Sequence, residues 1–259
     1  MATKYPIVLV HGIAFKDFNV FRAFGKVQHL LEHAGNKVST ARTDSFGRIQ
    51  TNAVQLKEHI ERVLSETGAK KVNIIAHSKG GLDARYMVYH LGMENKVASV
   101  TFLCTPHKGS QVATRLYGLP RFLRGFIAGS INFWYRLAGD KHPDALSVCR
   151  QLSYSPDGVL EDFNDSDGIY MQSYSTRMDR ASDDFVMGIP LMFSRNYEDG
   201  QTDGIVSVES SKFRHYRGHC VEGSVSHTEI VDFMVKKSKK EKIYTFYLSL
   251  CEDLRSRGY

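Results

Sequence analysis

The sequence contains no long hydrophobic segment. Its longest apolar stretches are short, such as Ile7 to Val10 and Ile74 to Ala76, whereas a helix that spans a bilayer needs about 20 predominantly apolar residues. We therefore expect no transmembrane segment. The apolar run after Lys4 is also too short for a signal peptide, and no cleavage site follows it. The chain is expected to be cytoplasmic, or secreted if it is a mature form without its leader.

Cysteine is scarce and widely spaced. None of the four cysteines forms a C-x-x-C pair, which argues against a zinc ribbon and against a thioredoxin-type redox motif; they are Cys104, Cys149, Cys220 and Cys251. Their pairing stays open. Cys104 ends the apolar run from Val100 to Leu103, where a small buried side chain is expected.

The sequence also lacks internal repeats, low-complexity segments and linkers. Its net charge of +6 is spread along the chain, apart from five lysines between Lys236 and Lys242, and this pattern does not indicate a nucleic-acid partner. A content of 42% hydrophobic and 24% charged residues is typical of a globular domain with a large core. We predict one domain over residues 1–259.

Short apolar runs without polar alternation predict strands that are covered on both faces. Between them lie helix-length segments, and this alternation predicts a mostly parallel central sheet flanked by helices. The predicted strands are Tyr5 to Val10, Lys37 to Thr40, Lys71 to Ala76, Lys96 to Cys104, Ile169 to Ser175 and the region near Gly204 to Val208.

Helices are predicted from apolar residues at helical spacing between start and stop signals. The first runs from Asn19 to Gly35. The second begins at a capping box of Asn52 and Gln55 and ends at Gly68. A third covers Gly81 to Leu91, and a last one carries the stripe Ile243, Phe246, Leu250 and Leu254.

The segment from Leu116 to Gly139 differs from the rest. It is rich in Leu, Phe and Tyr and holds the only tryptophan, Trp134, but glycines and a proline interrupt it. It has too much apolar surface for a solvated loop and too many helix breakers for one core helix. We predict a helical insertion, a lid or a fixed cap, at about residues 112–165.

Ser78 lies where the chemistry is expected. The segment Ala76 to Gly81 reads A-H-S-K-G-G, between a predicted strand and a predicted helix. It fits the G-x-S-x-G nucleophile elbow, with Ala76 replacing the first glycine. In such an elbow the serine has strained backbone geometry, so the residues two before and two after it must be small. Ala76 and Gly80 meet this requirement.

Acyl transfer also needs two N–H donors directed at the oxyanion. One comes from the residue after the nucleophile, here Lys79, and the other from a loop after an earlier strand. Ile13, which follows a predicted strand and the pair His11 and Gly12, is our choice for the second donor. We expect His11 itself to fix the loop by hydrogen bonds.

Three motifs together resemble a known family. Lys4 to Gly12, Ala76 to Gly81 and Thr105 to Ser110 are similar to the bacterial triacylglycerol lipases of the Pseudomonas and Burkholderia type. The likeness covers roughly residues 4–110 and resumes at Thr202 to Val206 and Ser226 to Glu229. It implies the α/β-hydrolase fold, with an acid at the first of these last two segments and a base at the second.

Chain order selects the same acid and base, because in this fold the acid follows the serine and the histidine follows the acid. Asp203 alone lies in a glycine-flanked turn that leads into an apolar run, although Asp199 is a second choice. His227 follows a loop of small residues. His215 and His219 are four apart, as in a helical metal site, but their neighbours favour a strand or loop.

The expected function is a serine carboxylester hydrolase, most simply a triacylglycerol lipase for medium- to long-chain acyl esters, with lipid esters and a lipid–water surface as its partners. A short-chain esterase, a lipid acyltransferase and a non-catalytic lipid-binding homologue are the alternatives. The chemistry requires no cofactor.

The resemblance further implies a structural calcium ion, which this sequence leaves open. The resembled lipases hold it with two aspartates, one of them two residues after the base. Here Glu229 stands at that position, Asp183 or Asp179 is available as the other ligand, and Phe233 occupies a place where a polar ligand is expected.

Overall fold

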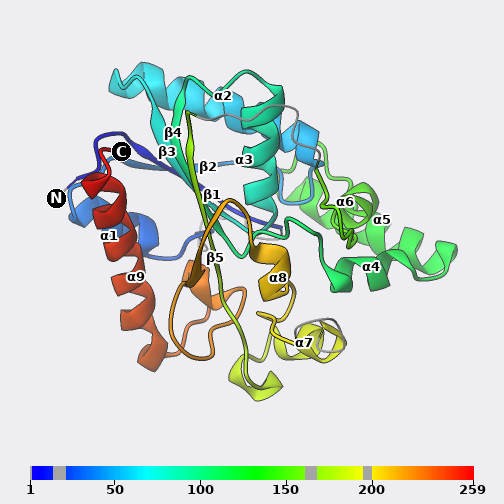
Figure 1. Ribbon diagram of the computed structural model, residues 1–259. Helices are drawn as coiled ribbons and strands as arrows, with labels where there is room; N and C mark the ends of the chain where they lie inside the picture. The colour runs from blue at the N-terminus through cyan, green and yellow to red at the C-terminus, as the bar shows by residue number, and fades with distance from the viewer. Residues whose placement is uncertain (1, 14–21, 161–167, 195–199) are drawn as a thin grey trace.

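The computed structural model describes residues 2–13, 22–160, 168–194 and 200–259. Within these ranges, six parallel strands form one sheet in the order β2-β1-β3-β4-β5-β6 (Figure 1). The strands are β1 (Ile7–Val10), β2 (Val38–Ala41), β3 (Val72–His77), β4 (Val97–Leu103), β5 (Tyr170–Ser175) and β6 (His215–His219).

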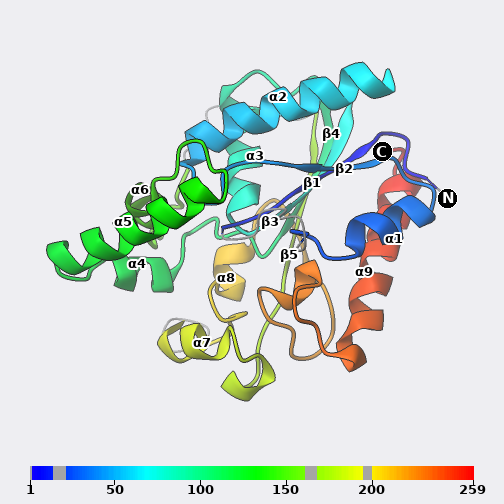
Figure 2. The same cartoon turned by 180° about the vertical axis from the view of Figure 1, so that it is seen from behind.

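Helices cover both faces of the sheet. Helices α2 (Ile49–Thr67) and α3 (Lys79–His90) lie on one face, and α1 (Val27–His33) and α9 (Lys237–Ser256) lie on the other (Figures 1 and 2). The remaining elements are α4 (Gln111–Tyr117), α5 (Arg121–Leu137), α6 (Ala145–Gln151), α7 (Gly188–Ser194), α8 (Val208–Ser211) and the 3₁₀ turns η1 (Ala181–Asp183) and η2 (Glu229–Val231).

The two-sided cover explains the unbroken apolar pattern of the strands. Side chains alternate between the faces of a strand, so in β1 Val8 and Val10 pack with α2 and α3, whereas Ile7 and Leu9 pack with α1 and α9. All four side chains are fully buried. The predicted parallel α/β architecture is confirmed, with five of the six predicted strands in place.

Helix α1 begins later than predicted. The expected start at Asn19 lies outside the described residues, and the helix begins at Val27. Gly25, with a φ of +48°, turns the chain just before it, and the N–H of Lys26 donates to Asp232 at 2.8 Å. Phe24, which lies inside the predicted helix, is buried in the segment just before this turn instead.

Helix α2 begins at Ile49, three residues before the predicted cap. Asn52 and Gln55 form no capping box, because their side-chain amides donate to the backbone and carboxylate of Asp44, at 2.7 and 3.0 Å. A tertiary contact with Asp44 thus uses the two side-chain amides that the sequence pattern assigned to the capping box of the helix. The predicted end is confirmed: Gly68 adopts the left-handed conformation with a φ of +67°.

The predicted strand near Gly204 to Val208 is wrong. Asp203 Oδ1 accepts hydrogen bonds from the N–H groups of Ile205 and Val206, at 3.0 and 2.8 Å, and Gly204 has a φ of +108°. These contacts close a tight turn, and the chain then enters the short helix α8. Aspartate and glycine therefore outweigh the apolar residues in this segment.

Helices α4, α5 and α6, which we call the cap, follow β4 and project from one end of the sheet (Figure 1). As expected for helix-breaking residues, the chain leaves the helix between α4 and α5 at Gly118 and Pro120. Helix α5, however, continues for 17 residues through Gly125 and Gly129. A Cβ at either of these two glycines would meet nothing within 4 Å. In the part of the chain that the structure describes, every helix is too short or too polar to span a bilayer.

Candidate active site

Ser78 sits in the sharp turn between β3 and α3. Its φ of 55° and ψ of −133° place it in a region that side chains rarely adopt, which costs on the order of 1–3 kcal/mol. The turn survives because its surroundings hold it: the N–H of Ser78 donates to the Leu103 carbonyl at 2.9 Å, and α3 starts at the next residue. The predicted strand-turn-helix elbow is present.

Glycine is required around this turn by close backbone approach. A Cβ at Gly80 would lie 2.4 Å from the His11 carbonyl oxygen, and a Cβ at Gly12 would lie 2.5 Å from the Ser78 Cβ. A Cβ at Gly81 would lie 2.0 Å from the side-chain oxygen of Thr105. The first strand's loop and the elbow are therefore in direct contact, as expected if both serve one site.

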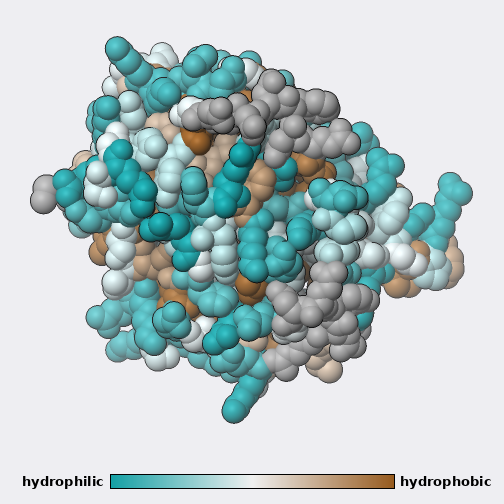
Figure 3. All heavy atoms as spheres, viewed as in Figure 1, coloured by the Kyte–Doolittle hydropathy of each residue, from teal (hydrophilic) through white to brown (hydrophobic). Residues whose placement is uncertain are grey.

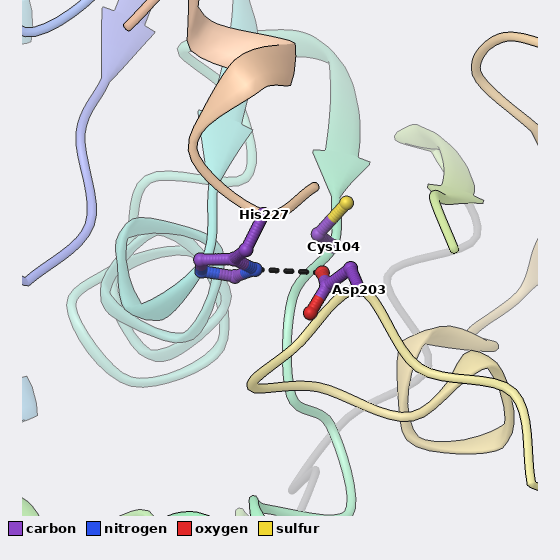
Figure 4. A group of neighbouring side chains, drawn as sticks. All are labelled: Cys104, Asp203 and His227. Carbon is purple, nitrogen blue, oxygen red and sulfur yellow. Dashed lines mark hydrogen bonds and ion pairs between the residues drawn. The ribbon is translucent and has the colours of Figure 1, made fainter. Parts of the chain in front are cut away.

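His227 links Ser78 to Asp203. Its Nδ1 lies 2.7 Å from Asp203 Oδ2, and its Nε2 lies 2.8 Å from Ser78 Oγ. Because a carboxylate only accepts hydrogen bonds, Nδ1 carries the proton and Nε2 is left to accept from the serine hydroxyl. All three side chains are buried. The sequence-selected serine, acid and base thus form one continuous hydrogen-bonded chain, of which Figure 4 shows the Asp203 and His227 half.

His77 is a site residue that sequence analysis did not single out. Its Nε2–H donates to the His227 carbonyl at 2.9 Å, and the two rings lie 4.5 Å apart. Burial, with the neighbouring His227, holds the pKa of His77 well below its ordinary value, so the ring is neutral. It ties the backbone of the base to the elbow. No sequence signal marks this role, because the partner is 150 residues away.

The two predicted oxyanion donors flank the serine. Lys79 supplies the first amide of α3, where the helix dipole favours negative charge. Ile13 follows Gly12, whose backbone contacts Ser78, and it lines the same cavity as Ser78. Their role as oxyanion donors stays a prediction, in which one donor follows the nucleophile and the other comes from the loop after β1.

Ser78 and His227 open into a cavity of about 650 Å³. This volume is in the range typical of small-molecule sites. Its wall is mostly apolar and comes from the cap, the turn after Asp203 and the segment before α7; the apolar lining includes Val112, Leu116, Leu119, Ile127, Ile131, Leu146, Val148, Leu152, Val186, Met187 and Ile205. Such a wall suits a hydrocarbon chain better than a polar substrate.

The side chain of Lys79 points away from the cavity into the protein. Its ammonium contacts the Asp83 carboxylate at 2.6 and 2.9 Å, and both side chains are 1% exposed. Burial raises the pKa of Asp83 to about 6 and lowers the pKa of Lys79. The charge of each side chain acts against this shift by stabilising the charged form of the other. This buried ion pair lies directly behind the elbow, and the sequence gave no reason to single it out.

Cys104 stands beside the acid and base at the end of β4 (Figure 4). Its sulfur, with Asp203 and His227, forms the one group of three potential metal ligands within 4.8 Å of one another among the described residues. Burial raises the pKa of the Cys104 thiol well above its ordinary value, so a thiolate ligand is disfavoured. Since His227 already binds both Asp203 and Ser78, the arrangement suits proton transfer. All four cysteines are free.

The other histidines lie apart from this chain of hydrogen bonds. His107 is buried, stacks on Phe213 with ring centroids 4.4 Å apart and contacts Arg85, so its ring packs inside the protein. His215 and His219 lie on strand β6 as expected. Residues four apart on a strand are separated by roughly 13 Å, so these two cannot share one metal ion.

The chain is similar in sequence to triacylglycerol lipases. Those of Pseudarthrobacter phenanthrenivorans and Burkholderia plantarii are each 37% identical over 169 residues, which is 59% of this chain. The match covers 51% and 46% of those relatives, so this chain spans about half their length. The resemblance found in the motifs is thus confirmed over more than half of the sequence.

The fold has counterparts among solved structures. The Staphylococcus hyicus lipase superposes with a TM-score of 0.71 at 14% identity, over 98% of this chain and 96% of that one. At this identity the likeness concerns the fold. The family described as alpha/beta hydrolase fold matches residues 5–155, more than half of the chain. The chain therefore belongs to the α/β-hydrolase family.

Proposed function

We propose that this protein is a serine carboxylester hydrolase, and specifically a triacylglycerol lipase that cleaves medium- to long-chain acyl esters. The observation that carries the proposal is the hydrogen-bonded chain from Ser78 through His227 to Asp203 at the wall of an apolar cavity. The similarity to triacylglycerol lipases supports the substrate class.

In the first half of the reaction, Ser78 Oγ attacks the ester carbonyl carbon while His227 Nε2 takes the hydroxyl proton. The negative charge that develops on the carbonyl oxygen accepts hydrogen bonds from the N–H groups of Lys79 and Ile13. His227 then gives its proton to the departing alkoxide, the carbon–oxygen bond of the ester breaks, and an acyl-serine remains. Asp203 holds the ring and stabilises the imidazolium.

In the second half, water replaces the alcohol. His227 takes a proton from the water, the hydroxide attacks the acyl carbonyl, and the same two amides hold the oxyanion. Collapse returns the proton to Ser78 and releases a carboxylic acid. No metal ion or organic cofactor takes part in these steps, because side chains supply the nucleophile and the base, and two backbone N–H groups supply the oxyanion donors.

The outer face of the cap supports action at a lipid surface. Helix α5 turns Ile127, Ala128 and Ile131 toward the cavity, and a second apolar stripe faces solvent, with exposed fractions between 60% and 80%; it consists of Phe122, Phe126, Phe133, Trp134 and Leu137. In Figure 3 a few brown side chains are visible at the edge of this projecting end, beside hydrophilic ones. Exposed apolar patches of this kind are typical of interaction sites, and here the partner that fits is a lipid–water interface.

The proposal is tested by hydrolysis of p-nitrophenyl esters from acetyl to palmitoyl, with the released acid quantified. We expect Ser78→Ala and His227→Ala to lose several orders of magnitude in kcat, since loss of a triad member in a related hydrolase costs on the order of 10⁶. His219→Ala, outside the site, is the matched control and should keep most activity. A serine-directed phosphonate should label Ser78 alone.

The outcomes separate the alternatives. A folded Ser78→Ala protein with near-wild-type hydrolysis would overturn the mechanism. Activity confined to acetyl esters would instead indicate a short-chain esterase. Transfer of the acyl group to an added alcohol, without free acid, would indicate an acyltransferase.

A further inference from the structure

Glu229 is a buried carboxylate in the loop that carries the proposed base, His227. It lies two residues after His227 and is 2% exposed. Its Oε2 accepts from the Ser226 N–H at 3.0 Å, while its own N–H donates to Ser226 Oγ at 3.1 Å. Ser226, one residue before His227, and Glu229, two residues after it, are therefore joined by hydrogen bonds from both side chains.

A second carboxylate holds the same loop from the other side. Asp184 Oδ2 accepts hydrogen bonds from the hydroxyls of Ser226 and Thr228, the two neighbours of His227. Its Oδ1 accepts from the N–H groups of Val186 and Met187. The position of the imidazole thus depends on two anionic side chains, and a buried anion is stable only when a positive charge accompanies it.

Lys239 supplies that charge to Glu229. Its Nζ lies 2.7 Å from Glu229 Oε2, and its side chain is 18% exposed. A charge-assisted hydrogen bond of this length is among the stronger polar contacts in proteins. Lys239 belongs to the first turn of α9, where the helix dipole disfavours a cation. The contact with Glu229 offsets this disadvantage.

The residues do not fit the calcium ion that the family resemblance implies. Calcium takes six to eight oxygen ligands, but the Glu229 oxygen already contacts an ammonium and an N–H. Asp183 Oδ2 accepts from Ser224 Oγ and from the Arg180 N–H. Asp179 is 57% exposed beside Arg177. Glu229 Oε2 and Asp183 Oδ2 are thus engaged with an ammonium and with N–H or O–H donors, and Asp179 lies in solvent near a guanidinium.

We propose that Lys239 is a positioning residue whose ammonium, through Glu229, holds the His227 loop in the place of a structural calcium ion. The inference rests on the proposed function, because it concerns the base of that reaction. It implies that activity is independent of calcium and depends on the charge at residue 239. It also implies that removal of this charge lowers kcat rather than raising KM, since Lys239 is not among the residues that line the cavity.

The test compares Lys239→Met with Lys239→Arg and with Lys237→Met, a matched removal of an exposed lysine from the same helix turn. On a soluble short-chain ester we expect Lys239→Met to lose about 10- to 100-fold in kcat, because misplacement of a reacting group by about 1 Å costs on this order, with KM nearly unchanged. Lys239→Arg should recover most of the loss, and Lys237→Met should match the wild type.

A second arm needs no variant. The wild-type protein is assayed, and its melting temperature measured, after chelation with EDTA and after addition of millimolar calcium chloride; we expect no change in either property. Full kcat in Lys239→Met, or calcium-dependent activity or melting temperature in the wild type, would overturn the assignment. If Lys239→Met does not fold, the wild-type arm still tests the calcium part of the assignment, and calcium-dependent activity or melting would still overturn it.

The two proposals fail in different ways. An active Ser78→Ala protein would overturn the hydrolase mechanism itself. An inactive Ser78→Ala protein combined with a fully active Lys239→Met protein would overturn the role of Lys239 alone.

Discussion

Lys79 combines two roles in one residue. Its backbone N–H is a proposed oxyanion donor, while its ammonium is buried against Asp83. Asn52 Nδ2 also donates to the Asp83 carboxylate, at 3.1 Å. Because Asn52 in turn donates to the Asp44 carbonyl, the elbow is connected through polar side chains to the loop before α2. This loop also holds the link between α5 and α6, since Asp44 accepts from the N–H groups of Lys141 and His142.

The buried pair gives a stability prediction. Lys79→Met alone leaves the Asp83 carboxylate buried without its cation, which is expected to cost about 3–5 kcal/mol in the free energy of unfolding. Lys79→Met combined with Asp83→Leu removes both charges and should recover most of that loss. Urea denaturation of the wild type and both variants measures the difference. A double variant as unstable as the single one would show that unpaired charge is not the cause.

The same pair predicts a pH dependence. The pKa of Asp83 is about 6 in the folded protein against 3.8 for an unperturbed aspartate, so between these values the folded state keeps a proton that the unfolded state has lost. Unfolding then releases a proton, and the free energy of unfolding falls as pH rises. From pH 4 to 6, as set by these two pKa values, we expect the wild type to lose stability relative to the Lys79→Met and Asp83→Leu double variant. Parallel curves would contradict this.

Single residues were predictable from sequence where local geometry demanded them. Ser78 lies in a turn that only small neighbours permit, and Asp203 and His227 follow it in the required order. His77, Asp83 and the side chain of Lys239 were not predictable as site residues. Their roles depend on a carbonyl, an ammonium and a carboxylate that the fold brings to them, and no local pattern encodes those partners.

Helix α5 is apolar on two sides, and this makes a prediction at the scale of the element. Phe126 and Trp134 are 76% and 66% exposed, and we expect them to contact lipid when the protein meets an emulsion. Phe126→Ser with Trp134→Ser should lower activity on emulsified triacylglycerol more than on a soluble short ester, because each apolar group that leaves water contributes about 25 cal/mol per Å² of buried area.

The measurement is the ratio of those two activities in wild type and variant. Val54→Ser with Leu248→Ser, which replaces exposed apolar residues on α2 and α9, is the control and should leave the ratio unchanged. An unchanged ratio in the folded Phe126 and Trp134 variant would mean that α5 is a fixed cover and that the protein acts as an esterase.

Strand and helix cores were predictable, but several boundaries were not. Apolar runs such as Val72 to Ala76 form strands because both faces are covered. The starts of α1 and α2 differ from prediction because Asp232 and Asp44, each distant in sequence, bind the groups near those starts. The turn after Asp203 was missed for a local reason: its carboxylate accepts from two N–H groups two and three residues further on, and this closes a turn in an apolar segment.

The whole molecule brings together residues 149 positions apart in the sequence. It does so because parallel strands end at the same edge of a sheet, so loops that follow different strands meet there. The alternation of strands and helices predicted this sheet and its two-sided cover. The lateral order of the strands and the position of the cap were not predictable, because they depend on packing between elements that are not neighbours in sequence.

The first and last described segments of the chain also meet, far from the cap. The N–H of Lys4 donates to the Tyr259 carbonyl at 2.7 Å, and both ends lie across the molecule from α4 and α5 (Figures 1 and 2). Attachment to a solid support through either end would therefore leave the cavity mouth facing the bulk liquid. A short peptide joining these two ends, with new ends opened in an exposed loop, would give a circularly permuted chain with the same sheet.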